Sequence, residues 1–330
     1  MSSTRKLCSA VLAGALALGL AACGSSNSGS SSGAGGIGSS GSGIAVAPGI
    51  QTPRTQAQSG GKRGGTLTVL NHTDFEHIDP GQSYYNIDYE AIYATQRPLF
   101  SYKPNTFSQP SPDMASEPAQ ISEGGKTITV HIRKGVHFSP PVNREVTSAD
   151  VAYAIERGAN GNVANPYWEA YFGSLVGAKE ELHKETGGPF PGITTPDKET
   201  IVFHLSEPKA PIVLAALVLP LSAPVPEEFA KKYDAKKPTE YGNYQVATGP
   251  YMFKSNGEGK VLGIGYIPGK SATLVRNPNW NPATDSRPAY LNQINIEIGG
   301  DTTVIGRQVL EGSDMVQNEA PAQPIVKLAY

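Results

Sequence analysis

The sequence is poor in cysteine and in charged residues. Its 330 residues include only two cysteines, Cys8 and Cys23, which excludes a disulfide-stapled fold and a cysteine-rich zinc fold. Charged residues make up 17 %, and 27 basic against 29 acidic side chains give a net charge of −2, so the basic excess of a nucleic-acid binder is absent. Long apolar runs are also lacking. Residues 7–22 form a run of 16 and residues 210–221 a run of 12, whereas a membrane-spanning helix needs about 20.

The N-terminus nevertheless has the features of an export signal. Arg5 and Lys6 precede an apolar stretch that ends in small residues, as a signal peptide does before its cleavage site. The tetrapeptide at 20–23, Leu-Ala-Ala-Cys, resembles the lipobox of bacterial lipoproteins, in which the cysteine is lipidated and becomes the new N-terminus. We therefore predict a lipoprotein signal peptide over residues 1–22 and a lipid on Cys23. The alternative is an ordinary signal anchor with a chance cysteine.

A flexible linker is predicted to follow, over residues 23–61. Residues 24–50 contain 9 Gly and 9 Ser among 27 residues and have almost nothing to bury. A chain of this composition from 24 to 60 has a root-mean-square reach of roughly 33 Å, enough to hold a domain clear of a membrane. Folding is expected to begin near Lys62.

The sequence after Lys62 mixes strand and helix patterns. Period-two alternation predicts strands over 66–69, 127–133, 201–205 and 294–298. Thr147 and Asp150 form a variant capping box at the start of a predicted helix that Gly158 can end. Pro226 and the two acidic residues after it predict a second helix. Together these patterns favour an α+β fold with a mixed sheet.

Three short motifs resemble catalytic or metal-binding patterns without the context they need. The G-x-S-x-G at 29–33 lies in the linker, with no strand before it and no helix after it. Residues 263–271 resemble a phosphate-binding loop, but the glycine spacing is wrong and a strand pattern follows, which favours a hairpin turn. His72, Asp74 and His77 lie close together without a third histidine, and loop polar groups are favoured over metal ligands. We therefore predict no catalytic residue, no metal and no cofactor.

Aromatic residues are concentrated in two places. Tyr84, Tyr85 and Tyr89 follow an Asp-Pro pair, and the second group, at 167–172, follows an Asn-Pro pair. Tyrosine suits the wall of a semi-polar ligand cleft because it offers a large apolar face together with a hydroxyl. Ordinary packing is the alternative for each residue taken singly.

Nine short segments over residues 62–315 form an ordered series. They are Gly64–Val69, Ile78–Pro80, Ile121–Thr127, Ile132–Phe138, Val146–Val151, Pro196–Phe203, Leu205–Pro208, Ala247–Tyr251 and Leu274–Trp280. In sequence and in order they resemble the extracellular solute-binding proteins of family 5, the oligopeptide-, dipeptide- and nickel-binding receptors of ABC importers.

The resemblance implies a type II, periplasmic-binding-protein-like clamp whose two lobes close on a solute. Residues 62–105 and 241–300 are then expected to form a discontinuous first domain, and residues 106–240 a domain inserted into it. The second lobe is expected to start at 301–330. Members of the family are considerably longer than 330 residues, so we expect the second lobe to be largely missing and tight solute binding by this chain alone to be absent.

The resemblance also implies ligand-binding residues. Tyr84, Tyr85 and Asn86 match the segment that lines the cleft in peptide-binding members, and Tyr167 matches a tyrosine on the inserted domain's side. Gln317 stands where the family often has an aromatic residue.

The function implied is that of a receptor that binds a peptide-like or other small solute and delivers it to ABC permease subunits. We expect an exported monomer, lipid-anchored on the outer face of the bacterial cytoplasmic membrane, with no catalysis and no nucleic-acid partner. A lipid-anchored secreted hydrolase and a non-transporting sensor or remnant of the same fold are the alternatives.

Overall fold

The computed structural model describes residues 61–103, 109–185, 187–312 and 315–329. The predicted signal peptide, Cys23 and all but the last residue of the predicted linker lie outside these residues. In the described part, no helix is long and apolar enough to cross a membrane.

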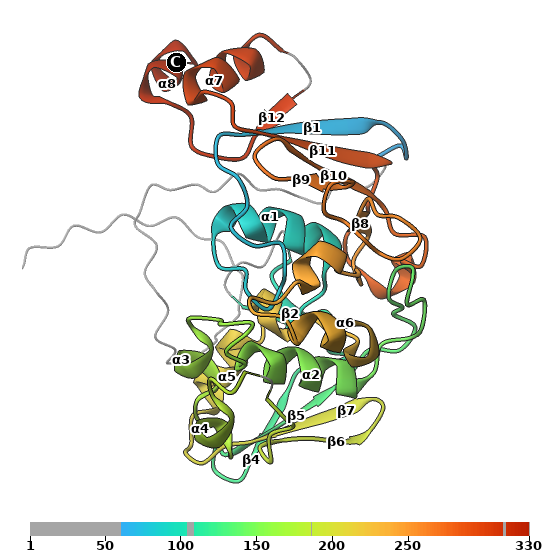
Figure 1. Cartoon of the computed structure of the whole chain (residues 1–330), viewed down its shortest axis with the longest axis vertical. Helices are drawn as coiled ribbons and strands as arrows, with labels where there is room; N and C mark the ends of the chain where they lie inside the picture. Colours follow the sequence, from blue (N-terminus) through green and yellow to red (C-terminus); the bar gives the residue numbers. More distant parts are fainter. Residues whose placement is uncertain (1–60, 104–108, 186, 313–314, 330) are drawn as a thin grey trace, which may run out of the picture. The chain divides into compact units, whose positions relative to one another are not determined.

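One sheet has six strands and contains both parallel and antiparallel pairs. β1 is parallel to β11 on one side and to β12 on the other, whereas β10 runs antiparallel to β11, β8 and β9 (Figure 1). The strands are β1 (Thr66–Asn71), β8 (Tyr251–Phe253), β9 (Tyr266–Ile267), β10 (Ser271–Arg276), β11 (Gln293–Ile298) and β12 (Met315–Gln317).

A second sheet has four strands, all antiparallel, in the order β4-β5-β7-β6. A short antiparallel pair, β2 with β3, makes a third sheet. The strands are β2 (Phe100–Ser101), β3 (Ser111–Pro112), β4 (Gln120–Ser122), β5 (Thr127–His131), β6 (Ile193–Asp197) and β7 (Thr200–His204). The mixed sheets confirm the predicted α+β class, and all four predicted strands are present.

Eight α-helices and three 3-10 turns complete the described part. The helices are α1 (Asn86–Thr95), α2 (Ser148–Gly158), α3 (Trp168–Phe172), α4 (Ala178–Glu181), α5 (Ala210–Ala216), α6 (Glu227–Asp234), α7 (Thr302–Leu310) and α8 (Gln323–Ala329). The 3-10 turns are Pro220–Ser222, Tyr241–Tyr244 and Pro282–Thr284.

Local chemistry sets the helix boundaries. The predicted capping box begins α2, because the Asp150 carboxylate accepts the Thr147 N–H at 2.8 Å, and the helix ends at Gly158. The prediction places Pro226 in the first turn of this helix. In the structure it is instead the N-cap residue, directly before α6. Residues 263–271 contain the predicted hairpin turn. β9 pairs antiparallel with β10, and the turn between them includes Gly269 in the left-handed region (φ 70°) that favours glycine.

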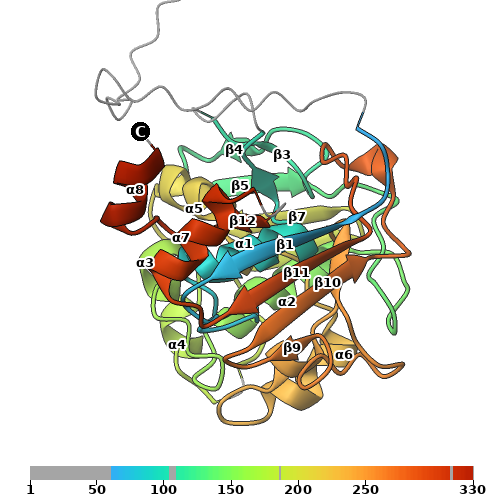
Figure 2. The same ribbon diagram turned by 90° about the horizontal axis from the view of Figure 1, so that it is seen from above.

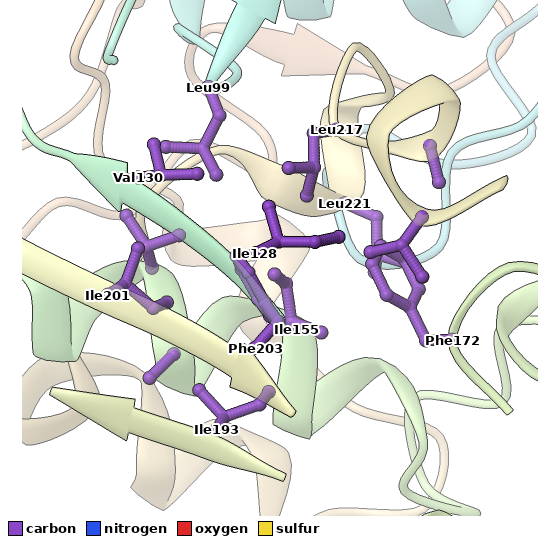
Figure 3. Packing of buried hydrophobic residues seen from close by; sticks show 14 of the residues in the cluster. Leu99, Ile128, Val130, Ile155, Phe172, Ile193, Ile201, Phe203, Leu217 and Leu221 are labelled. Carbon is purple, nitrogen blue, oxygen red and sulfur yellow. The ribbon is translucent and has the colours of Figure 1, made fainter. Parts of the chain in front are cut away.

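Each large sheet has its own apolar core. In Figure 3, Ile155 of α2 lies against Ile128 and Phe203 of the four-stranded sheet, and all three side chains are fully buried. A separate cluster packs against the six-stranded sheet and includes Val69, Leu274 and Ile296 from its strands.

Candidate ligand-binding cleft

β1 and β12 run side by side as parallel strands (Figure 2). A hollow lies at their carboxyl ends. It has a volume of about 960 Å³. Its walls come from the segment after β1, the segment after β12 and the start of α1. They are Thr73, Asp74, Glu76, Tyr84, Tyr85, Asn86, Ile87, Tyr89, Asn318, Glu319 and Ala320. Ligands of open α/β sheets typically bind just outside the carboxyl ends of parallel strands, so the position itself favours binding.

Hydrogen bonds fasten the segment after β12 to β1. The Glu319 carboxylate accepts the backbone N–H groups of His72 and Thr73 and the Thr73 hydroxyl. Glu90 on α1 accepts one N–H from the Asn318 amide at 2.8 Å and one from the Asn71 amide at 3.3 Å. The walls of the hollow are therefore joined to one another.

The buried Asp88 carboxylate organises the chain that enters α1. It accepts backbone N–H groups from Glu76 (2.9 Å) and His77 (3.4 Å), and from Tyr84 (3.3 Å) and Tyr85 (3.4 Å). Burial raises the pKa of Asp88, although these four donors act in the opposite direction. One carboxylate thus ties the segment after β1 to the tyrosines at the start of the helix.

The tyrosines form an aromatic group at the surface. The rings of Tyr84 and Tyr167 are stacked, with centroids 3.9 Å apart and an interplanar angle of 15°. Tyr85 meets Tyr84 edge to face at 5.6 Å. Tyr84 is 42 % exposed and Tyr85 is 54 % exposed, so two neighbouring aromatic side chains are open to solvent, and grouped exposed apolar residues often mark a binding site. Hydrogen bonding to Tyr84 raises the pKa of Tyr167 to about 12.

A buried ionic network holds the loop before Tyr84. The Arg157 guanidinium donates to both oxygens of Asp79, each at 2.8 Å, and to both oxygens of Asp234 at 2.6 and 2.8 Å. It also lies over the ring of Tyr241, 4.8 Å from the centroid. Burial alone would raise the pKa of Asp234, but Arg157 holds it below its usual value. The loop at 79–83 is therefore anchored to α2 and α6.

Asn165 joins this loop to the second tyrosine group. Its amide donates to the Gly81 carbonyl at 2.8 Å, and its side-chain oxygen accepts the Tyr167 N–H at 3.0 Å. The Asn165 side chain therefore holds both the loop before Tyr84 and the backbone of Tyr167, and so supports the stacking of the two rings.

The structure brings most of the predicted site residues together. Tyr84, Tyr85 and Asn86 line the hollow, whereas Tyr167 lines a smaller adjoining cavity of about 50 Å³ that Tyr84 also borders. Gln317 is the exception, because it lies within β12 opposite Leu70 and is not among the lining residues. The ligand-binding role of all five residues stays a prediction.

The residues that sequence reasoning missed come from the two strand ends. Asn318, Glu319 and Ala320 directly follow Gln317, and Glu76 lies between the histidines that were considered as metal ligands. The proximity of Gln317 in the sequence was the only signal for the first three.

Two of the three residues considered as metal ligands, His72 and Asp74, form hydrogen bonds to other parts of the chain. His72 pairs through Nδ1 with the Gly300 carbonyl at 2.7 Å, while Asp74 accepts the Tyr266 hydroxyl at 3.1 Å and the Gly269 N–H at 2.6 Å. Among the described residues, no group of three or more His, Cys, Asp or Glu side chains could hold a metal ion.

Comparison with known protein families matches residues 109–329 to the bacterial extracellular solute-binding proteins, family 5 Middle. The chain belongs to this family of extracellular solute-binding proteins.

Among curated relatives, the chain is similar to the periplasmic oligopeptide-binding protein OppA of Salmonella typhimurium. The two are 25 % identical over 267 residues, which is 80 % of this chain and 45 % of OppA. It is 30 % identical over 148 residues to a dipeptide-binding protein of Escherichia coli, covering 42 % of this chain and 26 % of that protein. The chain thus spans less than half the length of these relatives.

Solved structures show the same type II fold. The clavulanic acid biosynthesis oligopeptide binding protein 2 matches with a TM-score of 0.63 and 28 % identity, over 76 % of this chain and 43 % of the other. DppA from Helicobacter pylori, solved in complex with the peptide STSA, matches with a TM-score of 0.62 and 22 % identity, over 81 % of this chain and 49 % of the other.

Proposed function

We propose that this chain is a solute-binding receptor for an ABC importer and that its ligand is a peptide or a peptide-like small solute. The observation that carries the proposal is the hollow of about 960 Å³ at the carboxyl ends of β1 and β12, lined by exposed tyrosines, in a member of this family. Tyrosine rings and hydroxyls suit a ligand that alternates apolar side chains with polar backbone groups. The relatives named for binding oligopeptides and dipeptides support the same ligand class.

We propose further that the protein is exported and held by a lipid on Cys23 at the outer face of the cytoplasmic membrane, where it acts as a monomer without turnover. The lipobox-like tetrapeptide and the linker behind it support the anchor. Permease subunits are the proposed partners, by analogy with the family.

The domain division is also a proposal. The strands of 62–105 and 241–300 make up most of the six-stranded sheet, and those of 106–240 make up the four-stranded sheet, which supports two domains. β12 of 301–330 pairs with β1, so at least this strand belongs with the first sheet.

Titration of the purified chain with short peptides tests the proposed function. Nuclear magnetic resonance detects binding up to millimolar dissociation constants, so it covers weak as well as tight binding. We expect saturable shifts at tyrosines of the hollow and no consumption of the peptide over hours. Absence of saturable shifts for every peptide would reject the receptor function, and hydrolysis of the peptide would favour the hydrolase.

A further inference from the structure

We propose that the hollow at the ends of β1 and β12 selects ligands that carry a positively charged organic group, such as the ammonium of a lysine side chain. This inference rests on the proposed function and names the class of peptide that the same hollow prefers. It follows from the charges and aromatic faces of the wall, taken together with the position of the hollow.

The wall of the hollow carries charge of one sign only. Asp74, Glu76 and Glu319 line it, and none of the described lining residues is Lys, Arg or His. No ion pair involves any of these three carboxylates in the described part of the chain. A concave surface lined by one sign of charge concentrates ligands of the opposite sign.

Two further carboxylates stand directly behind this wall. Glu90 bonds to Asn318 of the wall, and Asp88 bonds to the backbone of Glu76 and Tyr84. Burial raises the pKa of Glu90, and the charge of Glu319 acts in the same direction. Burial is the main cause, and a cation bound nearby would act in the opposite direction, because it would favour the ionised form of Glu90.

The aromatic faces distinguish an organic cation from a metal ion. Tyr84 and Tyr85 border the same hollow and are about half exposed, although one face of Tyr84 is covered by Tyr167. An ammonium or guanidinium over a tyrosine ring is attracted by the ring's quadrupole. The carboxylates do not converge as a metal site would, since no group of three or more potential ligands is present among the described residues. A long side chain with a charged end matches a wall that is aromatic in one part and acidic in another.

Glu76 is the residue best suited to test the inference. Its side chain is exposed and makes no side-chain hydrogen bond or ion pair in the described part, so its replacement removes charge without breaking the fold. Glu319 is less suitable because it fastens β12 to Thr73. Glu258 is a matched control, since it is exposed and lies outside the hollow.

The experiment compares three tripeptides of matched length on the purified chain: Ala-Lys-Ala, Ala-norleucine-Ala and Ala-Glu-Ala. We expect the lysine peptide to bind up to about fivefold more tightly than the norleucine peptide, because a solvent-exposed ion pair contributes up to about 1 kcal/mol, and the glutamate peptide to bind most weakly. Added salt should shrink the difference. Glu76→Gln should reduce the lysine preference at least twofold, whereas Glu258→Gln should leave it unchanged.

The outcomes separate this inference from the proposed function. Equal binding of the lysine and norleucine peptides, or tightest binding of the glutamate peptide, overturns the charge preference and leaves peptide binding intact. An unchanged preference in Glu76→Gln overturns the assignment to this hollow. If none of the three peptides binds, the proposed function fails and the inference fails with it.

Discussion

The ring of Tyr84 lies nearly parallel to that of Tyr167, with the centroids 3.9 Å apart, although 83 positions separate the two residues in the sequence. Tyr84 enters from the loop before α1 and Tyr167 from the turn before α3. The stacked pair therefore joins a segment next to the six-stranded sheet to one that packs with the four-stranded sheet.

Removing one ring of this pair should weaken ligand binding. We expect Tyr84→Ala to raise the dissociation constant of the lysine tripeptide roughly two- to fivefold, because a cation over an exposed tyrosine ring contributes about 0.5–1 kcal/mol. Peptide titration measures the effect. Tyr102→Ala is the control, since Tyr102 is similarly exposed but lines a different cavity. Equal effects of the two substitutions would show that the stacked pair has no special role.

We expect Asn165 to support ligand binding by positioning the rings of Tyr84 and Tyr167, without contacting the ligand itself. Asn165→Ala removes the bonds to Gly81 and Tyr167, and we expect it to lower the free energy of unfolding by about 1–3 kcal/mol and to broaden the Tyr84 and Tyr167 resonances. Asn165→Asp keeps the acceptor for the Tyr167 N–H and loses the donor to Gly81, so it should recover part of the loss. Urea unfolding measures both variants, and an Asp variant worse than the Ala variant would contradict this role.

Sequence patterns predicted the elements whose cause is local. The strand 127–133 alternates apolar and polar residues, and the capping box at Thr147 and Asp150 lies within one helical turn, so both were found with nearly correct bounds. β12 was not predicted, because three residues are too few to show a period and its pairing with β1 joins distant parts of the chain.

For the candidate site, too, only the residues that lie together in one segment could be predicted. Tyr84, Tyr85 and Asn86 could be proposed from their motif, because one continuous segment carries them. Glu319 reaches the hollow only through the pairing of β12 with β1, and the sequence around residue 319 contains no pattern that predicts this pairing. The bonds from Arg157 to Asp79 and Asp234 span 78 and 77 positions, and only the folded chain brings these residues together.

Arg157 should be the costliest of the charged residues to replace. Arg157→Met leaves Asp79 and Asp234 buried without their cation, and we expect a loss of about 3–5 kcal/mol in the free energy of unfolding, measured by urea denaturation. Lys231→Met breaks an exposed pair with Glu227 and should leave the free energy of unfolding nearly unchanged.

If Arg157→Met does not fold, a milder variant tests the same network. Thr239→Ala removes a methyl group and the hydroxyl that donates to Asp234 at 2.6 Å and accepts the Tyr241 N–H at 3.2 Å, and it should cost about 1–2 kcal/mol. A Thr239→Ala variant as stable as the wild type would mean that this network does not anchor the loop at 79–83.

We expect Cys23 to determine whether the protein is attached to the membrane. We expect Cys23→Ala to release the protein from membranes or to block its processing, because the thiol would carry the diacylglyceryl group, whose two acyl chains suffice for stable anchoring. Cys8→Ala changes a cysteine within the predicted signal peptide and should have no such effect. Membrane fractionation with detection of the lipid measures both, and identical behaviour of the Cys23 variant and the wild type would exclude the lipid anchor.

Glu156 should make the stability of the protein depend on pH. Burial raises its pKa to about 7, with Glu227 and Glu181 acting in the same direction, although its side chain accepts the Phe190 N–H at 3.1 Å. Because the folded pKa lies above the unfolded value, the folded chain holds the proton more tightly. Its contribution to the free energy of unfolding is therefore complete below about pH 4.5 and declines as the pH rises towards 7.

Glu156→Gln isolates this contribution from the other titrating groups. Glutamine keeps an oxygen that can accept the Phe190 N–H but carries no charge at any pH. The variant should therefore resemble the wild type near pH 4 and become more stable than it by up to about 3 kcal/mol at pH 8. Urea midpoints between pH 4 and pH 8 measure the difference, with Glu169→Gln, an exposed glutamate on α3, as the control. A difference that stays constant across this range would mean that the Glu156 carboxyl does not lose its proton near pH 7 in the folded chain.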